Sequence, residues 1–330
     1  MTDHTRLHTK PFDIRLSTPE DYPALAAIKS VMVPDRPTTA EEYLHEDDIR
    51  DPRIRHRRWV VEVEGRVVGE AYYTQLATLY HPCKFVIGGW VLPEFQRRGI
   101  GTALYHMITQ ALQPYDPIYY HVFARGTHPE GIAFLAHRGF TEVFRERVSI
   151  LDVYAFDSGP YSGLEGKLLA QGIVIHTLAE LRTDPDHTHK LYDLDWQVFN
   201  DIPDLTEPPV RMPYDTWLKE TIEHPQIVPD AFFVAVKGCE YVGLSYLYVA
   251  TGKSSMIYSG LAGVRRGLRR QGIALAMKVR GIAYARQRGY TTLWTSNAVH
   301  NQPILALNER LGFVRQYETV EMMKRLREEQ

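Results

Sequence analysis

Two segments of the sequence combine basic residues and glycines in a spacing that suits the binding of a phosphate group. Residues 96–101 read Gln-Arg-Arg-Gly-Ile-Gly, and residues 269–274 read Arg-Arg-Gln-Gly-Ile-Ala. Each segment precedes a stretch whose apolar residues recur at helical spacing. The first turn of a helix has unpaired backbone N–H groups and a positive dipole end, and glycine lets a ligand approach the backbone closely. The segments therefore predict two sites for a phosphate or a pyrophosphate.

Neither segment fits the two best-known phosphate-binding loops. The dinucleotide fingerprint needs Gly-x-Gly-x-x-Gly near the start of a parallel βαβ unit, and the P-loop needs Gly-Lys followed by Ser or Thr. For one segment taken alone, an exposed charged turn remains an alternative interpretation.

The two segments belong to an internal repeat. Gly99 and Gly272 are 173 residues apart. The same distance separates two further pairs of glycines, namely Gly65 from Gly238 and Gly139 from Gly312. Because three landmarks share one spacing, we interpret the chain as a duplicated domain, with a unit far longer than a solenoid repeat.

The elements that must position these segments recur in the same order in both copies. The first copy predicts strands at residues 58–64, 66–76, 84–92, 118–123 and 141–153, with helices at 19–31, 39–47, 99–112 and 131–137. The second predicts strands at residues 231–236, 240–250, 255–264, 291–295 and 314–324, with helices at 184–199, 215–224, 272–288 and 302–310. Each copy is predicted to be α+β, with a mixed, mostly antiparallel central sheet flanked by helices.

The boundary between the copies follows from a turn-rich stretch. Residues 157–163 contain two glycines, two serines and a proline, and a new apolar strand begins near residue 173. We predict an N-terminal domain at residues 11–156, a linker with a helix at 157–172, and a C-terminal domain at 173–330.

Composition excludes several classes of protein. The 330 residues carry 38 Lys and Arg against 40 Asp and Glu, which gives no support to a nucleic-acid protein with a broadly basic surface. Cys83 and Cys239 cannot form a disulfide framework, and no apolar run approaches a membrane span. We expect a cytoplasmic protein without nucleic-acid or membrane partners, and no metal site, since His187 and His189 lack a second cluster.

The sequence around the first loop resembles a known family. Residues 91–104 read Val-Leu-Pro-Glu-Phe-Gln-Arg-Arg-Gly-Ile-Gly-Thr-Ala-Leu and resemble the acetyl-CoA motif of the GNAT N-acetyltransferase superfamily; residues 264–276 are similar to it. Residues 297–313, which end in Asn-Glu-Arg-Leu-Gly-Phe, resemble the next motif of that family. The resemblance covers both halves and implies two tandem GNAT-like domains.

This resemblance implies acetyl-CoA as a co-substrate and no metal. The loop amides would hold the CoA pyrophosphate, and Val91 and Val264 would end the splayed strand that pairs with the pantetheine arm. In the family, a strand amide near this point also polarises the thioester carbonyl. The implied cofactor-binding residues are Val91, Gln96, Arg97, Arg98, Gly99, Ile100, Gly101, Thr102, Val264, Arg269, Arg270, Gln271, Gly272, Ile273, Ala274, Asn301 and Asn308.

The first copy departs from the second motif of the family. The positions that correspond to Asn297, Asn301 and Asn308 are Ala124, His128 and Leu135. The tyrosine that often protonates the leaving thiolate in this family would fall at Leu135 and Asn308, so neither half carries it. Because the C-terminal half keeps the asparagines of the second motif, we expect that half to be the catalytic one.

The implied reaction is direct attack of an amine on the acetyl thioester, which needs a base for the ammonium proton. Candidates on the central strands are Glu70, His121 and Tyr119 in the first half and Tyr246, Tyr258 and Ser259 in the second, with a role as core or pocket lining as the alternative for each. Acidic and aromatic residues early in the second half predict an acceptor pocket for a cationic amine: Asp195, Trp196, Asn200, Asp201 and Asp204.

Three functions remain open at this point. The leading one is an N-acetyltransferase for a small-molecule amine. The others are a catalytically silent acyl-CoA-binding or scaffold protein and a protein N-acetyltransferase. Because the duplication can supply internally the packing that single domains obtain by pairing, we expect a monomer, as an internal pseudo-dimer, or a weak homodimer.

Overall fold

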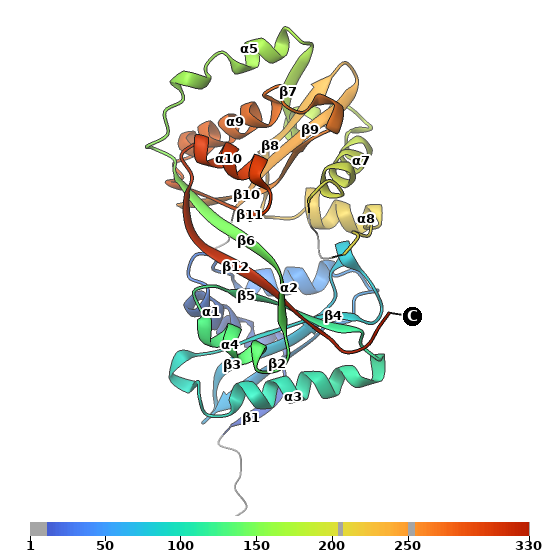
Figure 1. The fold of residues 1–330 in the computed structure, drawn as a ribbon, viewed down its shortest axis with the longest axis vertical. Coiled ribbons are helices and arrows are strands. Elements are labelled where there is room, and N and C mark those ends of the chain that lie inside the picture. Colours follow the sequence, from blue (N-terminus) through green and yellow to red (C-terminus); the bar gives the residue numbers. More distant parts are fainter. Residues whose placement is uncertain (1–11, 204–206, 250–254, 330) are drawn as a thin grey trace, which may run out of the picture. The chain divides into compact units, whose positions relative to one another are not determined.

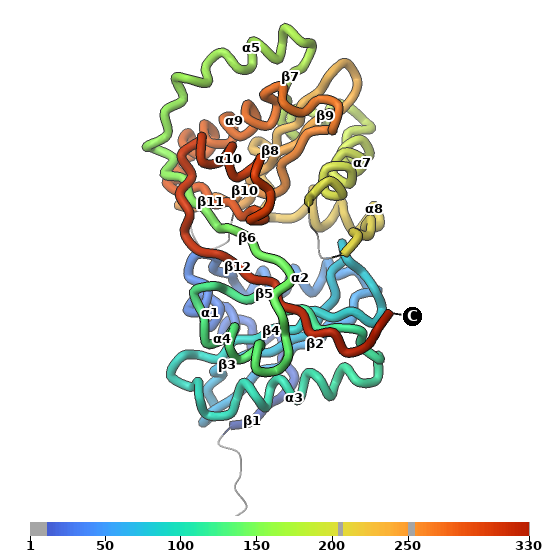
Figure 2. Tube along the Cα trace, in the orientation of Figure 1, coloured from blue at the N-terminus to red at the C-terminus, as the bar shows by residue number. Residues whose placement is uncertain are grey.

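A computed structural model describes residues 12–203, 207–249 and 255–329. Four residues that end a predicted domain or strand, or that belong to the predicted acceptor pocket, lie outside these ranges: Pro11, Asp204, Ala250 and Gln330. The described chain, traced from blue to red in Figure 2, divides into two compact units. Unit 1 contains residues 12–76, 81–122 and 325–329, and unit 2 contains residues 77–80 and 123–324.

Unit 1 is built on five strands in sequence order, and the last residues of β5 belong to unit 2. Neighbours from β1 to β4 are antiparallel, whereas β4 and β5 are parallel. The strands are β1 (Asp13–Leu16), β2 (Arg57–Val63), β3 (Arg66–Thr74), β4 (Lys84–Val91) and β5 (Tyr119–Arg125). The helices are α1 (Tyr22–Met32), α2 (Ala40–Ile49) and α3 (Ile100–Leu112), labelled in Figure 1.

Unit 2 has a sheet in the order β12-β6-β11-β10-β9-β8-β7. Its strands are β6 (Thr141–Asp152), β7 (Ile173–Thr177), β8 (Ile227–Lys237), β9 (Glu240–Val249), β10 (Met256–Val264), β11 (Thr292–Ala298) and β12 (Val314–Arg325). Its helices are α4 (Pro129–Ala136), α5 (Leu164–Leu169), α6 (Leu178–Leu181), α7 (His187–Phe199), α8 (Tyr214–Trp217), α9 (Ile273–Gln287) and α10 (Gln302–Arg310).

Strand β6 belongs to the first sequence repeat but lies between two strands of the second. It pairs antiparallel with β11 from Asp152↔Thr292 to Glu146↔Ala298, and along its other edge with β12. The compact units therefore do not follow the sequence repeat. The α+β architecture predicted for both halves is confirmed, whereas the domain limits at residues 156 and 173 stay a prediction.

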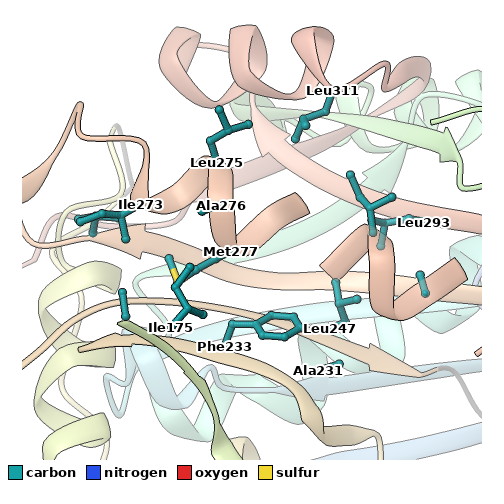
Figure 3. Packing of buried hydrophobic residues seen from close by; sticks show 14 of the residues in the cluster. Ile175, Ala231, Phe233, Leu247, Ile273, Leu275, Ala276, Met277, Leu293 and Leu311 are labelled. Atoms are coloured by element: carbon teal, nitrogen blue, oxygen red, sulfur yellow. The ribbon is translucent and has the colours of Figure 1, made fainter. Parts of the chain in front are cut away.

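Two apolar clusters cover opposite faces of the sheet in unit 2. Phe233 and Ala235 of β8 pack with α9, as Figure 3 shows for Phe233 beside Met277. Phe232 and Val234 pack with α7 and α8. Because successive residues of a strand point to opposite faces, this alternation places α7 and α9 on opposite sides of β8 and β9 (Figure 1).

One residue breaks the apolar pattern of α9. Lys278 lies on the buried face of the helix and is 7% exposed. Burial lowers the pKa of its ammonium group from 10.5 to about 8.

The described residues were searched for membrane-spanning helices and for groups of metal-binding side chains. None of the helices within the described ranges is long and apolar enough to cross a membrane. The same ranges contain no group of three His, Cys, Asp or Glu side chains placed to hold a metal ion, and both cysteines are free.

We expect Lys278→Met to stabilise the protein. Since the unfolded state binds the lysine proton more tightly, stability rises with pH between about 8 and 10.5, and below pH 8 the lysine costs about 3 kcal/mol. Urea unfolding near neutral pH should show most of this gain for the methionine variant, and unfolding near the upper end of that pH window should show little. A loss of stability at neutral pH would contradict the prediction.

Candidate functional site

The two glycine loops share one backbone conformation. After β4, a short 3-10 turn (Pro93–Phe95) is followed by Arg97 with φ of +60° and by Gly99 with φ of +83°, which caps α3. After β10, a similar turn (Arg266–Leu268) is followed by Arg270 with φ of +66° and by Gly272 with φ of +88°, which caps α9. The repeat in sequence is therefore also a repeat in local geometry.

Left-handed φ at Gly99 and Gly272 explains why glycine stands there. A β-carbon is disfavoured in this conformation whatever the space around it. A β-carbon at Gly99 would meet no heavy atom of the described residues within 4 Å, and one at Gly272 would meet only Leu164, at 3.8 Å. The outer side of each loop is thus open to a ligand.

Both helices begin with amides that precede the first intrahelical bond. That bond runs from Ala103 N–H to the Gly99 carbonyl (3.0 Å) and from Ala276 N–H to the Gly272 carbonyl (2.9 Å). The amides of the residues between them stand at the positive end of the helix dipole. Each loop therefore has the geometry of an anion site, next to side chains that are exposed: Arg97, Arg98, Arg270 and Gln271.

Gln96 and Arg269 hold the loops in shape with their side chains. Gln96 Nε2 donates to the Val91 carbonyl, and Arg269 Nε donates to the Val264 carbonyl, both at 2.9 Å. Two different residue types at matching positions thus make the same contact to the end of the preceding strand.

Asp201, which follows the C-terminus of α7, binds the second loop. Its carboxylate accepts from Arg266 Nε at 2.7 Å and from the guanidinium of Arg269. Hydrogen bonds from Arg266 lower the pKa of Asp201 against the effect of burial. The sequence predicted Asp201 for the acceptor pocket, whereas its carboxylate bonds to the second glycine loop, where its single negative charge offsets part of the positive charge of two arginines.

In each half, the strand that leads to the loop separates from its parallel neighbour. β4 and β5 pair over Lys84–Val86, and β10 and β11 pair from Met256↔Thr292 to Tyr258↔Trp294. The remainder of β10 is irregular, with a shift of register between Ser259 and Ala262. An unpaired strand edge offers backbone groups to an extended ligand.

The predicted catalytic residues do not come together. Tyr258 and Ser259 are neighbours on β10 and point to opposite faces: Tyr258 stacks against Tyr248 at 5.4 Å, while Ser259 lines a small cavity with Lys278. Glu70 lies in unit 1, is 2% exposed, and accepts a hydrogen bond of 3.3 Å from Tyr43. Burial raises the pKa of Glu70.

Asp195 belongs to α7, which packs against β10. Val198, one turn later on the same helix, packs so closely on the strand that a β-carbon at Gly263 would be 2.3 Å from it. Burial raises the pKa of Asp195 to about 6, while the neighbouring indole of Trp217 acts in the opposite direction. This carboxyl group therefore changes its protonation state near neutral pH.

Tyr246 of β9 lies against β10. A β-carbon at Gly260 would be 2.0 Å from its ring. Burial, and after it the charge of Asp195, raises the pKa of the Tyr246 hydroxyl. From the sequence, Asp195 was predicted only as a pocket residue. Its spacing of one helical turn from the apolar Val198 could have indicated that it lies on the side of the helix that faces the sheet.

Unit 1 has a related arrangement with a different acid. The ring of Tyr72 lies across Gly88 of β4, where a β-carbon would be 2.6 Å from it, and Glu70 is two residues away on the same face of β3. The residue 173 positions after Glu70 is Gly243, and the one 173 positions before Asp195 is Tyr22. The buried carboxyl group of one half and the half-buried one of the other thus come from different elements.

Asn308 joins α10 to β11. It is 3% exposed, and its amide donates to Asn297 Oδ1 at 2.7 Å, which Thr295 also approaches at 3.3 Å. Asn301 caps α10 and accepts from Leu305 N–H through its backbone carbonyl at 3.1 Å. Their roles as cofactor contacts stay a prediction.

The sequence profile of the Acetyltransferase (GNAT) family matches residues 22–140 and 188–313. These two regions together cover well over half of the chain, one in each repeat, so the chain belongs to this family. No curated protein sequence matches the chain.

Solved structures share the fold over the whole chain. A tandem GNAT protein from the clavulanic acid biosynthesis pathway is 17% identical with a TM-score of 0.73, covering 97% of this chain and 100% of that one. A GCN5-related N-acetyltransferase from Sphaerobacter thermophilus is 21% identical with a TM-score of 0.70, covering 97% of both. A GCN5-related glucosamine N-acetyltransferase region of a fungal multi-domain β-N-acetylglucosaminidase is 14% identical with a TM-score of 0.70, covering 96% of this chain and 38% of that one.

We expect Asp201→Asn to tighten the binding of CoA to the second loop. Removing the carboxylate releases Arg266 and Arg269 to face a pyrophosphate, a gain of about 1 kcal/mol at low salt that shrinks as ionic strength rises. Calorimetric titration with CoA at two salt concentrations measures both effects. Weaker binding by the variant would mean that the carboxylate matters more for holding the loop than for opposing the ligand.

Proposed function

We propose that the protein is an acetyl-CoA-dependent N-acetyltransferase that moves an acetyl group to the amine of a small molecule, and that the C-terminal half performs the transfer. Membership of the GNAT family implies acyl transfer from an acyl-CoA. The observation that carries the finer proposal is the position of Asp195: a half-buried carboxyl group with a pKa of about 6, on the helix that packs against the strand leading to the second glycine loop.

The residues of this half would act in sequence along β10. The loop amides after Gly272 bind the pyrophosphate, and the free edge of β10 pairs with the pantetheine arm. Ionised Asp195 takes a proton from the acceptor ammonium, and the free amine attacks the thioester carbonyl. The nitrogen–carbon bond forms and the carbon–sulfur bond breaks, and the proton that the attacking nitrogen then loses passes through water to the leaving CoA thiolate.

The face of the sheet around Asp195 favours a cationic acceptor. Tyr246, Tyr248 and Tyr258 present aromatic rings there, and Trp217 lies beside the carboxyl group. Aromatic faces and a carboxylate both attract an ammonium ion. We propose that the N-terminal half binds acetyl-CoA at the loop around Gly99 without transferring its acetyl group.

The two glycines test which half is active. We expect Gly272→Glu to abolish acetyl transfer to an amine library that includes polyamines, aminoglycosides and glucosamine, because a carboxylate side chain would occupy the anion site and the left-handed φ would be strained. Gly99→Glu, the matched control, should retain most activity. Release of CoA thiol measures both variants.

Three results would contradict this assignment. Unchanged transfer by Gly272→Glu would move catalysis to the other half. Tight CoA binding without turnover on any amine or peptide would favour the scaffold function. Turnover on peptides alone would favour a protein N-acetyltransferase.

Asp195 predicts a pH dependence. A base must be ionised to accept a proton, so kcat/KM should rise with pH through about 6 and level off above it. Asp195→Asn should lower kcat by about 100-fold or more and remove that rise. Asp193→Asn, on an exposed part of the same helix where Asp193 binds Arg211, is the control and should keep the profile. A rise at the same pH in Asp195→Asn would assign it to another group.

A further inference from the structure

A small cavity in unit 2 contains an unusual combination of groups. Its polar members are Lys278 of α9, Ser245 of β9 and Ser259 of β10. The rest of the lining is apolar: Phe233, Leu247, Gly281, Ile282, Leu293 and Phe313, of which Phe233, Leu247 and Leu293 are labelled in Figure 3. The cavity has room for about one water-sized group.

Lys278 has no anionic partner in the part of the chain that the structure describes. Its Nζ lies 5.8 Å from the centroid of the Phe313 ring. None of the other residues that line the cavity has an ionisable side chain. Other buried charged groups are bonded: Arg58 to Asp47, and Glu70 to Tyr43. An unpaired buried ammonium group is costly to the fold, and acetyl transfer as described above makes no use of it.

The cavity lies where β10 and β11 begin to separate. Ser259 comes directly after Tyr258, the last residue of β10 that pairs with β11, and Leu293 directly precedes its partner Trp294. The edge of β10 that does not pair with β11 runs from there toward the loop around Gly272, where α9 also starts, and Lys278 is in the second turn of that helix. An extended arm that is held at the loop and pairs along this edge therefore approaches the cavity.

We propose that the cavity receives one oxygen of a carboxylate at the far end of the acyl group, and that Lys278 with Ser245 and Ser259 selects an acyl-CoA whose acyl chain ends in such a group. The inference rests on the proposed function, because it needs the acyl-CoA to bind at the second loop. It adds a second class of donor, which the C-terminal half binds more tightly than acetyl-CoA.

The energetics favour such a ligand. The fold has already removed the lysine amine from water, so only the carboxylate must be desolvated when the ion pair forms. The two serine hydroxyls can also donate to the carboxylate, and charge-assisted bonds of this kind are the stronger ones. An acetyl group reaches none of these partners and leaves the amine unpaired.

Two acyl-CoAs of nearly equal shape isolate the charge. Malonyl-CoA ends in a carboxylate, whereas acetoacetyl-CoA has a methyl ketone in its place. Their affinities are measured by calorimetric titration of the full chain carrying Gly99→Glu, with acetyl-CoA as the reference. Lys278→Met removes the amine but keeps an apolar side chain of similar length. Tyr105→Phe, at the matching position of the first half, is the control.

We expect the protein to bind malonyl-CoA at least about tenfold more tightly than acetoacetyl-CoA. Lys278→Met should bring the two affinities within about twofold and leave that for acetyl-CoA unchanged, while Tyr105→Phe keeps the preference. Equal affinities in the parent protein, or a preference that survives Lys278→Met, would overturn the proposal. Failure of all three acyl-CoAs to bind would instead contradict the proposed function.

Discussion

The separation of β10 from β11 depends on β6. A strand can leave its neighbour only if its backbone groups remain bonded elsewhere. β11 parts from β10 after Trp294, yet it stays paired with β6 as far as Ala298. Since β6 comes from the first sequence repeat, a strand of the first repeat keeps β11 hydrogen-bonded where β11 separates from β10 in the second. This exchange explains why a duplicated chain would be kept whole rather than split into two independent domains.

Both copies of the repeat have the same glycine loop, whereas the residues around the loop differ. Both loops have the same left-handed residues and the same bond from the loop to the end of the strand, although Gln96 makes it in one and Arg269 in the other. The acids differ: Glu70 comes from a strand and Asp195 from a helix. The residue at the cavity differs too: Lys278 lines it in one half, and Tyr105 stands at the matching position of the other. Such differences suit two halves that bind the same kind of cofactor but do different things with it.

The sequence could predict what depends on local chemistry. The loop glycines, the hairpin at Gly65 and the order of the strands follow from turn residues and periodicity. The helix expected at residues 215–224 is instead α8 followed by a π-helical turn, and β1 was missed because its four residues are mostly exposed and half charged. The exchange of β6, the contact of Asp201 with the loop, and the opposite directions of Tyr258 and Ser259 depend on long-range packing, which a spacing of 173 residues does not reveal.

A count of the acetyl-CoA molecules bound and consumed per chain shows whether both halves bind the donor and only one transfers its acetyl group. Equilibrium dialysis gives the number of acetyl-CoA molecules held per chain, and a single-turnover experiment with saturating amine gives the number converted to CoA in the first cycle. We expect two acetyl-CoA molecules bound per chain and one consumed, because both loops have the anion-site geometry and only one half is proposed to transfer the acetyl group. Two consumed per chain in that first cycle, or none with any amine, would contradict it.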